Sequence, residues 1–181
     1  MKHLLIIMTL FFALNVSAQK YFTKTGATEF MASVEAFEPI SASSTSTTAI
    51  LDISTGDIAA LIFVRSFHFK IALMEEHFNE NYMDTKDFPK ATFKGKLDRF
   101  DMTKLTSIWQ EFTMTGTLNI RGVDKVINDV IKLKKVAGKI VVQGALIVAP
   151  SDFKIDIPGA VSSKIAKEIK VTMDYELVEK K

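Results

Sequence analysis

The sequence predicts an all-β fold of about eight antiparallel strands with one short amphipathic helix, arranged as a closed barrel or a sandwich. Three segments, residues 91–97, 112–120 and 169–177, alternate between apolar and polar residues. This period of two is typical of strands that bury one face and expose the other. Another segment repeats its apolar residues at spacings of three and four, as an amphipathic helix does. No second set of core segments follows, so one domain accounts for all of these elements.

The alternation identifies the face of each strand that we expect to point inward. Polar residues fill the intervening positions, and an antiparallel sheet with one solvated face produces this pattern. The inward positions are Ala91, Phe93, Gly95 and Leu97 in the first segment, Phe112, Met114, Gly116, Leu118 and Ile120 in the second, and Ile169, Val171, Met173, Tyr175 and Leu177 in the third.

Six further segments complete the strand prediction. The short sequence Ser54-Thr-Gly-Asp57 separates two of them and predicts a tight hairpin turn, in which Gly56 supplies the positive φ. The Ser/Thr tract at residues 41–48 predicts a loop. The six segments are residues 21–32, 48–53, 58–70, 126–133, 139–148 and 153–157.

The predicted helix follows from Ile71, Met74, Phe78 and Tyr82, which recur at spacings of three and four. Acidic and amide residues lie between them, as expected for a helix with one apolar face. The helix comprises about three turns and ends before Pro89, because a proline disfavours the helical conformation at the residue that precedes it.

Residues 1–18 are typical of a secretory signal peptide. A basic start is followed by an apolar run over residues 4–14 and by Val16-Ser17-Ala18, which supplies the small residues of a cleavage site. The apolar run is too short to cross a hydrocarbon layer of ~30 Å, so we expect no stable membrane insertion. We expect cleavage before Gln19, a barrel domain over residues 19–181, and a periplasmic or secreted protein.

The composition excludes several classes of function. The 23 basic and 21 acidic residues nearly balance and form no basic stripe, so we expect no nucleic-acid partner. The chain has no Cys and none of the common nucleotide or hydrolase motifs, so we predict no catalytic residue, no cofactor and no enzyme activity. His77 beside Glu76 and Glu80 is the nearest approach to a metal site. One His without further ligands is better explained as part of a solvent-exposed helix face, so we predict no metal site.

The inward positions also give a set of candidate ligand-binding residues. If the interior is hollow, apolar side chains of matching parity line it, and Met74 and Phe78 of the helix lie near one mouth. Arg65 shares this parity; it either anchors a polar head group or lies at the rim. The candidates are Phe63, Arg65, Phe67, Phe69, Met74, Phe78, Phe93, Met114, Leu118, Val142 and Leu146.

Gly95, Gly116 and Gly144 complete the candidate binding residues. Each occupies an inward position between large apolar residues, although Gly inside a strand is unfavourable by roughly 0.5–1 kcal/mol relative to Ala. Two benefits would offset this cost. The missing side chains either widen the interior for a ligand or relieve strain where a strand coils tightly.

The chain resembles the YceI-like family over most of residues 21–177. The resemblance lies in Ser66-Phe-His-Phe69, Leu73-Met-Glu-Glu-His-Phe-Asn-Glu-Asn-Tyr-Met83, Phe88-Pro-Lys-Ala-Thr-Phe-Lys-Gly95, Gly116-Thr-Leu-Asn-Ile-Arg-Gly-Val-Asp-Lys125, Ala149-Pro-Ser-Asp-Phe-Lys-Ile-Asp-Ile-Pro158 and Ile165-Ala-Lys-Glu-Ile169. Asn119 and Asp124 stand where the family usually has Thr, and Arg121 where it usually has His.

The resemblance implies an extended eight-stranded lipocalin-like barrel that binds a polyisoprenoid, an isoprenoid quinone or another lipid-like molecule. No catalytic residue is attributed to this family, so the resemblance implies none here. Two alternatives remain open: an enzyme acting on a hydrophobic substrate, with Asp129 as an inward carboxylate, and a filled barrel that serves as an interaction or stress module. The sequence leaves the oligomeric state open, a homodimer among the alternatives.

Overall fold

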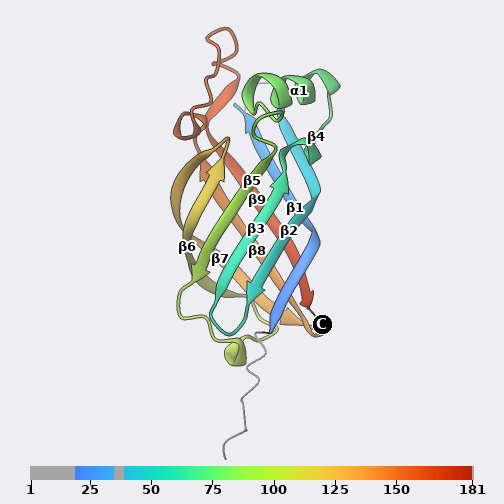
Figure 1. Ribbon diagram of the computed structural model, residues 1–181, viewed down its shortest axis with the longest axis vertical. Helices are drawn as coiled ribbons and strands as arrows, with labels where there is room; N and C mark the ends of the chain where they lie inside the picture. The colour runs from blue at the N-terminus through green and yellow to red at the C-terminus, as the bar shows by residue number, and fades with distance from the viewer. Residues whose placement is uncertain (1–18, 35–38, 181) are drawn as a thin grey trace, which may run out of the picture.

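The structure, a computed structural model, describes residues 19–34 and 39–180, so the predicted signal peptide lies outside the described residues. Strands dominate the architecture (Figure 1). The elements in chain order are β1 (Lys20–Ser33), β2 (Ser41–Asp52), β3 (Asp57–Phe63), η1 (Val64–Ser66), β4 (His68–Phe69), α1 (Ala72–His77), η2 (Phe78–Tyr82), β5 (Lys90–Leu97), η3 (Met102–Lys104), β6 (Gln110–Ile120), β7 (Val123–Val136), β8 (Lys139–Val148), η4 (Pro150–Phe153) and β9 (Ile165–Glu179).

The eight long strands form one antiparallel sheet that closes on itself. Closure occurs at β1, which pairs with β9 along one edge and with β2 along the other. The remaining order is β9-β8-β7-β6-β5-β3-β2, and the two-residue β4 pairs only with β2. The predicted eight-stranded antiparallel barrel with one short helix is therefore confirmed, and the sandwich alternative is excluded.

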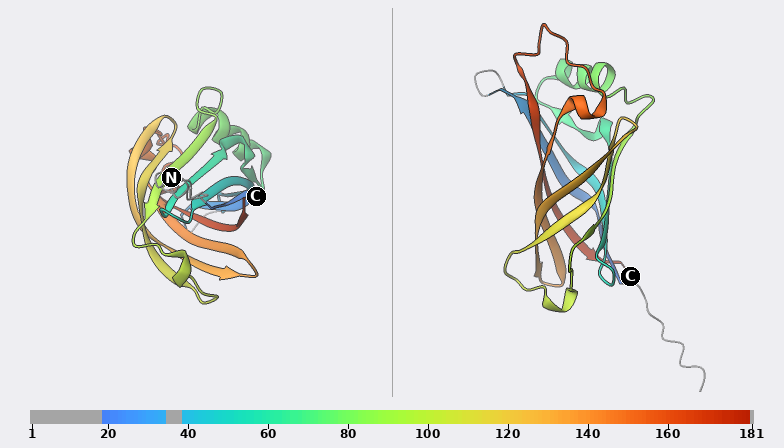
Figure 2. Two further views of the ribbon diagram at one scale, coloured as in Figure 1. Left: turned by 60° about the horizontal axis from the view of Figure 1, so that its bottom comes forward. Right: turned by 90° about the vertical axis from the view of Figure 1, so that its left-hand side faces the viewer.

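The two ends of the barrel differ (Figure 2). One end carries α1, η2 and η4, and we call it the helical end. The opposite end carries the β2–β3 turn, η3 and the C-terminus, and we call it the turn end (Figure 1). The helical end therefore has long connections over its opening, whereas short connections close most of the turn end.

The interior is solid toward the turn end. Its central side chains are at most 1% exposed, and burying each such aliphatic side chain contributes roughly 1.5–3 kcal/mol. A second, smaller cluster, centred on Phe30 and Phe67, lies toward the helical end. The side chains of the solid region are Leu51, Leu97, Ile131, Leu133, Ile140, Val142 and Leu177.

The loop prediction for residues 41–48 is wrong, because this tract forms the first half of β2. The polar composition suggests a loop, but β1 supplies a ladder of backbone partners. The inward hydroxyl groups also find partners: Thr47 Oγ1 lies 2.8 Å from Thr28 Oγ1, and Ser44 Oγ lies 2.8 Å from Ser66 Oγ. Buried hydroxyl groups are tolerated in a strand when they are hydrogen-bonded.

The predicted continuous strand over residues 58–70 is also wrong, because β3 ends at Phe63. Ser66 Oγ donates a hydrogen bond to the Phe63 carbonyl at 2.6 Å, and the Phe67 N–H donates to the Val64 carbonyl at 3.2 Å. These bonds close η1 and reset the phase of the alternation. As a result Val64 and Phe67 are buried, whereas Phe63 and Arg65 are exposed.

The prediction for residues 153–157 fails for a similar local reason. Pro150 has no N–H to donate to a ladder and begins the 3-10 turn η4, and Lys154 then adopts a φ of +55°. No strand forms there. The predicted helix is present: α1 and η2 follow one another over residues 72–82, with π-helical geometry in the second part.

The glycines on β5 and β6 mark a close approach of the two strands. Gly95 and Gly116 are cross-strand partners with inward positions. A Cβ on Gly95 would lie 2.5 Å from the Thr115 carbonyl oxygen and 2.6 Å from the Phe93 ring, and a Cβ on Gly116 would meet the Lys94 carbonyl oxygen. The neighbouring backbone therefore requires glycine here. Tight coiling explains these two positions better than widening of the interior does, because the Phe93 ring occupies the vacated space.

We expect Gly116→Ala to lower the free energy of unfolding by about 1–3 kcal/mol, because the added methyl group must push β5 away or shift the Phe93 ring. Thermal and urea unfolding of the ligand-free protein measure this effect. Gly159→Ala is the matched control, since a Cβ at position 159 meets nothing within 4 Å. Equal stabilities of the two variants would contradict the close-approach explanation.

Candidate functional site

A cavity of about 190 Å³ occupies the half of the barrel toward the helical end. Side chains from every barrel strand except β7 line it, together with residues from η1, η2 and η4 and from the segments around them. All of the lining residues are uncharged, and most are aliphatic or aromatic. The solid region closes the cavity toward the turn end.

The structure brings six of the predicted ligand-binding residues together on the wall of this cavity. They come from four elements, η2, β5, β6 and β8, and from the connection between η1 and β4, and those on β5, β6 and β8 show the inward parity that the sequence indicated. Gly95 and Gly116 lie directly behind one of them, the Phe93 ring. The six residues are Phe67, Phe78, Phe93, Met114, Leu118 and Leu146.

Two of the predicted residues lie on the outer surface, so their inward placement is wrong. Phe63 is 53% exposed, and Lys90 Nζ lies 5.2 Å from its ring centroid. Arg65 is exposed and its Nε donates a hydrogen bond to Thr85 Oγ1 at 2.9 Å. The η1 turn causes both errors, because it breaks the strand through which their parity was extrapolated. Arg65 is therefore a rim residue.

Four more predicted residues are inside or near the barrel but do not line the cavity. Val142 is fully buried in the solid region, and Gly144 lies against the Ile131 side chain, where a Cβ would be 2.7 Å from Ile131 Cγ2. Phe69 packs on the aromatic cluster above the cavity, and Met74 is half-buried on α1. Parity identifies the inward face of a strand but not the depth at which the interior becomes hollow.

Four phenylalanine rings cover one side of the cavity at the helical end, and we call them the aromatic cap. Phe30 of β1 lies with its ring centroid 5.1 Å from Phe67, 5.7 Å from Phe69 and 5.4 Å from Phe78. The Phe69 and Phe78 rings are 5.1 Å apart. Such pairs contribute ~0.5–1.5 kcal/mol each beyond their buried area, so the cap holds η2 against β1 and β4.

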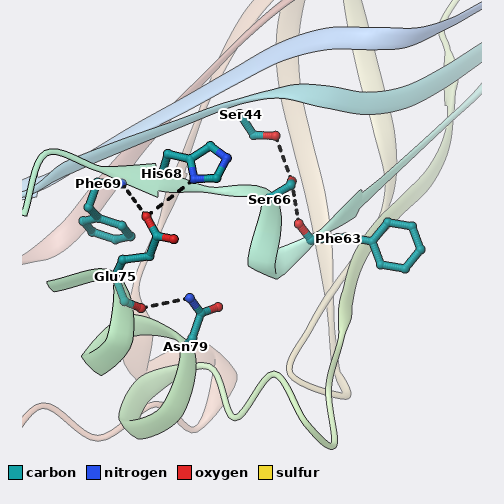
Figure 3. Close-up of polar contacts among 7 residues, drawn as sticks. All are labelled: Ser44, Phe63, Ser66, His68, Phe69, Glu75 and Asn79. Carbon is teal, nitrogen blue, oxygen red and sulfur yellow. Dashed lines mark hydrogen bonds and ion pairs between the residues drawn. The ribbon is translucent and has the colours of Figure 1, made fainter. Parts of the chain in front are cut away.

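Glu75 fastens the helix to the strand beneath the aromatic cap (Figure 3). Its Oε2 accepts a hydrogen bond from the Phe69 N–H at 3.0 Å and lies 3.6 Å from His68 Nδ1. Its carbonyl oxygen accepts a hydrogen bond from Asn79 Nδ2 at 2.9 Å. One residue therefore links β4, α1 and η2, which fixes the position of Phe78 over the cavity.

The other side of the helical end is closed by η4. The β7–β8 ladder extends only over residues 131–136 of β7, so the first half of β7 has no ladder partner on β8. Phe153 of η4, 1% exposed, lies on the cavity wall. The β6–β7 turn fastens this segment, because Arg121 Nη1 donates a hydrogen bond to the Lys154 carbonyl at 2.6 Å and Lys125 pairs with Asp152.

The three residues at which this sequence differs from the family that it resembles have structural roles at the helical end; they are Asn119, Arg121 and Asp124. Arg121 holds the segment after η4 and lies over the Phe88 ring, with Cζ 5.8 Å from its centroid. Asn119 Nδ2 donates a hydrogen bond to Asp124 Oδ1 at 2.6 Å across the β6–β7 hairpin. The two substitutions that flank the turn thus form a pair with each other.

Four residues with hydroxyl groups lie on the otherwise apolar wall, and three of them are joined by hydrogen bonds into what we call the hydroxyl cluster; the fourth is Thr92. Thr28 Oγ1 lies 2.8 Å from Thr47 Oγ1 and 3.0 Å from the Tyr175 hydroxyl, and all three residues line the cavity. Burial raises the pKa of Tyr175 above its ordinary value of 10.0, while its hydrogen bond with Thr28 and the neighbouring Thr47 hydroxyl group act in the opposite direction. The phenol therefore stays protonated at neutral pH.

Sequence reasoning missed most of the hydroxyl cluster and two of the aromatic residues that close the cavity. Tyr175 lies on a correctly predicted inward face, where a single hydroxyl among aliphatic residues was an available signal. Thr47 was concealed by the loop prediction for its segment. The position of Phe153 depends on η4, whose contact with β7 joins distant parts of the chain. The role of Phe30 could be predicted only by knowing that its end of β1 lies under the helix, where its ring meets Phe78.

The described residues offer little chemistry for catalysis. No group of three or more His, Asp or Glu side chains among them could hold a metal ion. Asp129 does not line the cavity, and its Oδ1 accepts a hydrogen bond from the Val130 N–H at 2.8 Å. Within the same residues, no helix has the length and apolar character needed to cross a membrane.

The model of the YceI-like domain family matches residues 16–177. Among solved structures, a polyisoprenoid binding domain from Saccharophagus degradans is similar, with a TM-score of 0.76, 16% identity, and coverage of 89% of this chain and 98% of that domain. BcnA from Burkholderia cenocepacia gives a TM-score of 0.68, 17% identity, and coverage of 84% and 96%. At these identities the likeness establishes the barrel fold. Among curated protein sequences, none matches.

We expect a large addition on the cavity wall to cost less stability than a similar addition in the solid region. Ala60 lines the cavity and Val142 is fully buried outside it. Ala60→Leu should change the free energy of unfolding by less than about 1 kcal/mol, because the new side chain enters empty space, whereas Val142→Phe should lower it by about 1–3 kcal/mol through overpacking. Urea unfolding of both variants without ligand measures the difference. Equal losses would contradict the division into hollow and solid halves.

Proposed function

The chain belongs to the YceI-like family, and on that premise we propose that it is an exported, non-catalytic protein that holds a polyisoprenoid or similar amphiphile in its cavity. The observation that carries the proposal is the uncharged, largely apolar wall of a cavity closed at one end by a solid core. The similar domain from Saccharophagus degradans is described as polyisoprenoid binding, which supports the ligand class. An isoprenoid quinone belongs to that class.

The energetics favour an elongated apolar ligand. Each buried CH₂ group contributes ~0.8 kcal/mol, so a tail of several isoprene units offsets an association cost of ~4–15 kcal/mol. Met83, Met114 and Met173 line the cavity, and flexible thioethers adapt to tails of different shape. A ligand held in this way needs few polar contacts, which agrees with the small number of polar groups on the wall.

An enzyme acting on a hydrophobic substrate would need an acid and a base near the bound molecule. Among the described residues, those that line the cavity include neither a carboxylate nor a His, Lys or Arg side chain, and Tyr175 is the only ionisable one. This arrangement supports binding rather than catalysis. The six predicted residues that line the cavity, from Phe67 to Leu146, are accordingly proposed as ligand contacts.

We expect native mass spectrometry of the gently purified protein to detect a retained apolar molecule, because the cavity shields it from water. Ala60→Leu, which narrows the cavity, should reduce the retained fraction several-fold. Ala59→Leu is the matched control, since the neighbouring residue on β3 does not line the cavity. Equal retention by the two variants, or no ligand in any preparation or after incubation with polyisoprenoids, would count against this function. Conversion of the ligand on incubation would favour an enzyme instead.

Export is a separate part of the proposal and rests on residues 1–18. We expect Edman sequencing of the protein recovered from the periplasm or the medium to begin at Gln19, because Val16 and Ala18 supply the small residues before the cleavage site. Ala18→Leu should block processing while leaving synthesis intact. An intact Met1 on the recovered wild-type protein would refute the assignment.

A further inference from the structure

The hydroxyl cluster lies at the boundary between the hollow and solid halves of the barrel. Thr28, Thr47 and Tyr175 are 8%, 2% and 6% exposed, and all three line the cavity. Hydroxyl groups are costly to bury, and Val and Phe of similar shape would fill the same space without that cost. Their grouping at one place on a wall whose other residues, apart from Thr92, are apolar therefore indicates a role that Val or Phe could not perform.

Irregularities in two ladders place these hydroxyl groups together. The register of β1 with β2 shifts on either side of Gly26, and the register of β1 with β9 shifts between Phe22 and Ala27. The Tyr175 ring lies against Gly26, where a Cβ would be 2.5 Å from Tyr175 Cδ1. Bulges re-aim side chains next to binding sites, and here the bulged stretch and the missing side chain allow the phenol to reach Thr28.

The hydrogen-bonding capacity of the cluster is only partly used. Three hydroxyl groups carry three hydrogen atoms, and in the described residues two hydrogen bonds connect them. One hydrogen atom therefore remains for an acceptor. Within residues 19–34 and 39–180, the adjoining wall contains no charged group that could neutralise an ionised ligand.

We propose that the hydroxyl cluster is the head-group subsite of the cavity and that it selects amphiphiles with a neutral oxygen acceptor, such as a ketone or quinone carbonyl. This inference rests on the proposed function. The carbonyl accepts the remaining hydroxyl hydrogen at the closed end of the cavity, and the apolar tail extends toward the aromatic cap. A phosphate or carboxylate head is excluded from this position, because no cation among the described residues of the wall would pair with it.

Three probes that share a farnesyl tail test the subsite: farnesylacetone with a neutral ketone, farnesyl phosphate with an ionised head, and β-farnesene with no polar head. Their affinities are measured by displacement of a fluorescent isoprenoid. The variant Thr28→Val/Thr47→Val/Tyr175→Phe removes all three hydroxyl groups together, which leaves no polar partner unpaired. The control Thr23→Val/Tyr21→Phe makes the same kinds of change on buried residues that do not line the cavity.

We expect the triple variant to bind farnesylacetone about five-fold more weakly, which is the effect of one net hydrogen bond, and to bind the other two probes as the wild type does. The control variant should bind all three normally. The carbonyl stretching frequency of bound farnesylacetone should be lower in the wild type than in the triple variant. If the triple variant does not fold, Tyr175→Phe and Thr47→Val replace it, and weaker ketone binding in at least one is expected.

Unchanged ketone binding in the triple variant would overturn the subsite, and so would an equal loss for all three probes. In both cases the wild type still binds farnesyl compounds, so the proposed function stands. Failure of all three probes to bind the wild-type protein would instead overturn the proposed function, and the subsite with it.

Discussion

The pairing of β1 with both β9 and β2 is the contact on which the rest of the structure depends. It turns eight strands into one closed sheet, so that all of their inward faces share a single interior. A closed sheet has no free edges along its ladders, and the gap where β7 separates from β8 is covered by η4. β1 pairs with both neighbouring strands because its register shifts near Gly26, and the same shifts bring Thr28 toward the cavity.

The sequence predicts the regular part of this fold well, because the alternation of apolar and polar residues in a strand shows which of its faces is buried. The inward faces of β5, β6 and β9 follow directly from residues such as Phe93, Met114 and Tyr175. Alternation fails where a short hydrogen-bonded turn resets its phase. This explains why Phe63 and Arg65 are predicted to point inward but lie outside. The hydrogen bond from Ser66 to Phe63 that closes the turn cannot be detected from hydrophobic periodicity.

The site is less predictable than the fold, because it depends on depth along the barrel and on contacts between distant segments. Val142 and Leu146 have the same parity on β8, yet one lies in the solid region and the other on the cavity wall. The hydrogen bond between Thr28 and Tyr175 joins residues 147 positions apart. A pattern within one strand contains neither kind of information.

The separation of a solid half from a hollow half has an evolutionary consequence. Tightly packed residues such as Leu51, Leu133 and Leu177 constrain one another, and most substitutions there are expected to be removed by selection. Residues that face the cavity have empty space beside them, so their size can change without unfolding the barrel. Mutations can therefore explore new cargo shapes in one half of the molecule while the other half preserves the fold, which makes such a barrel a readily diversified scaffold.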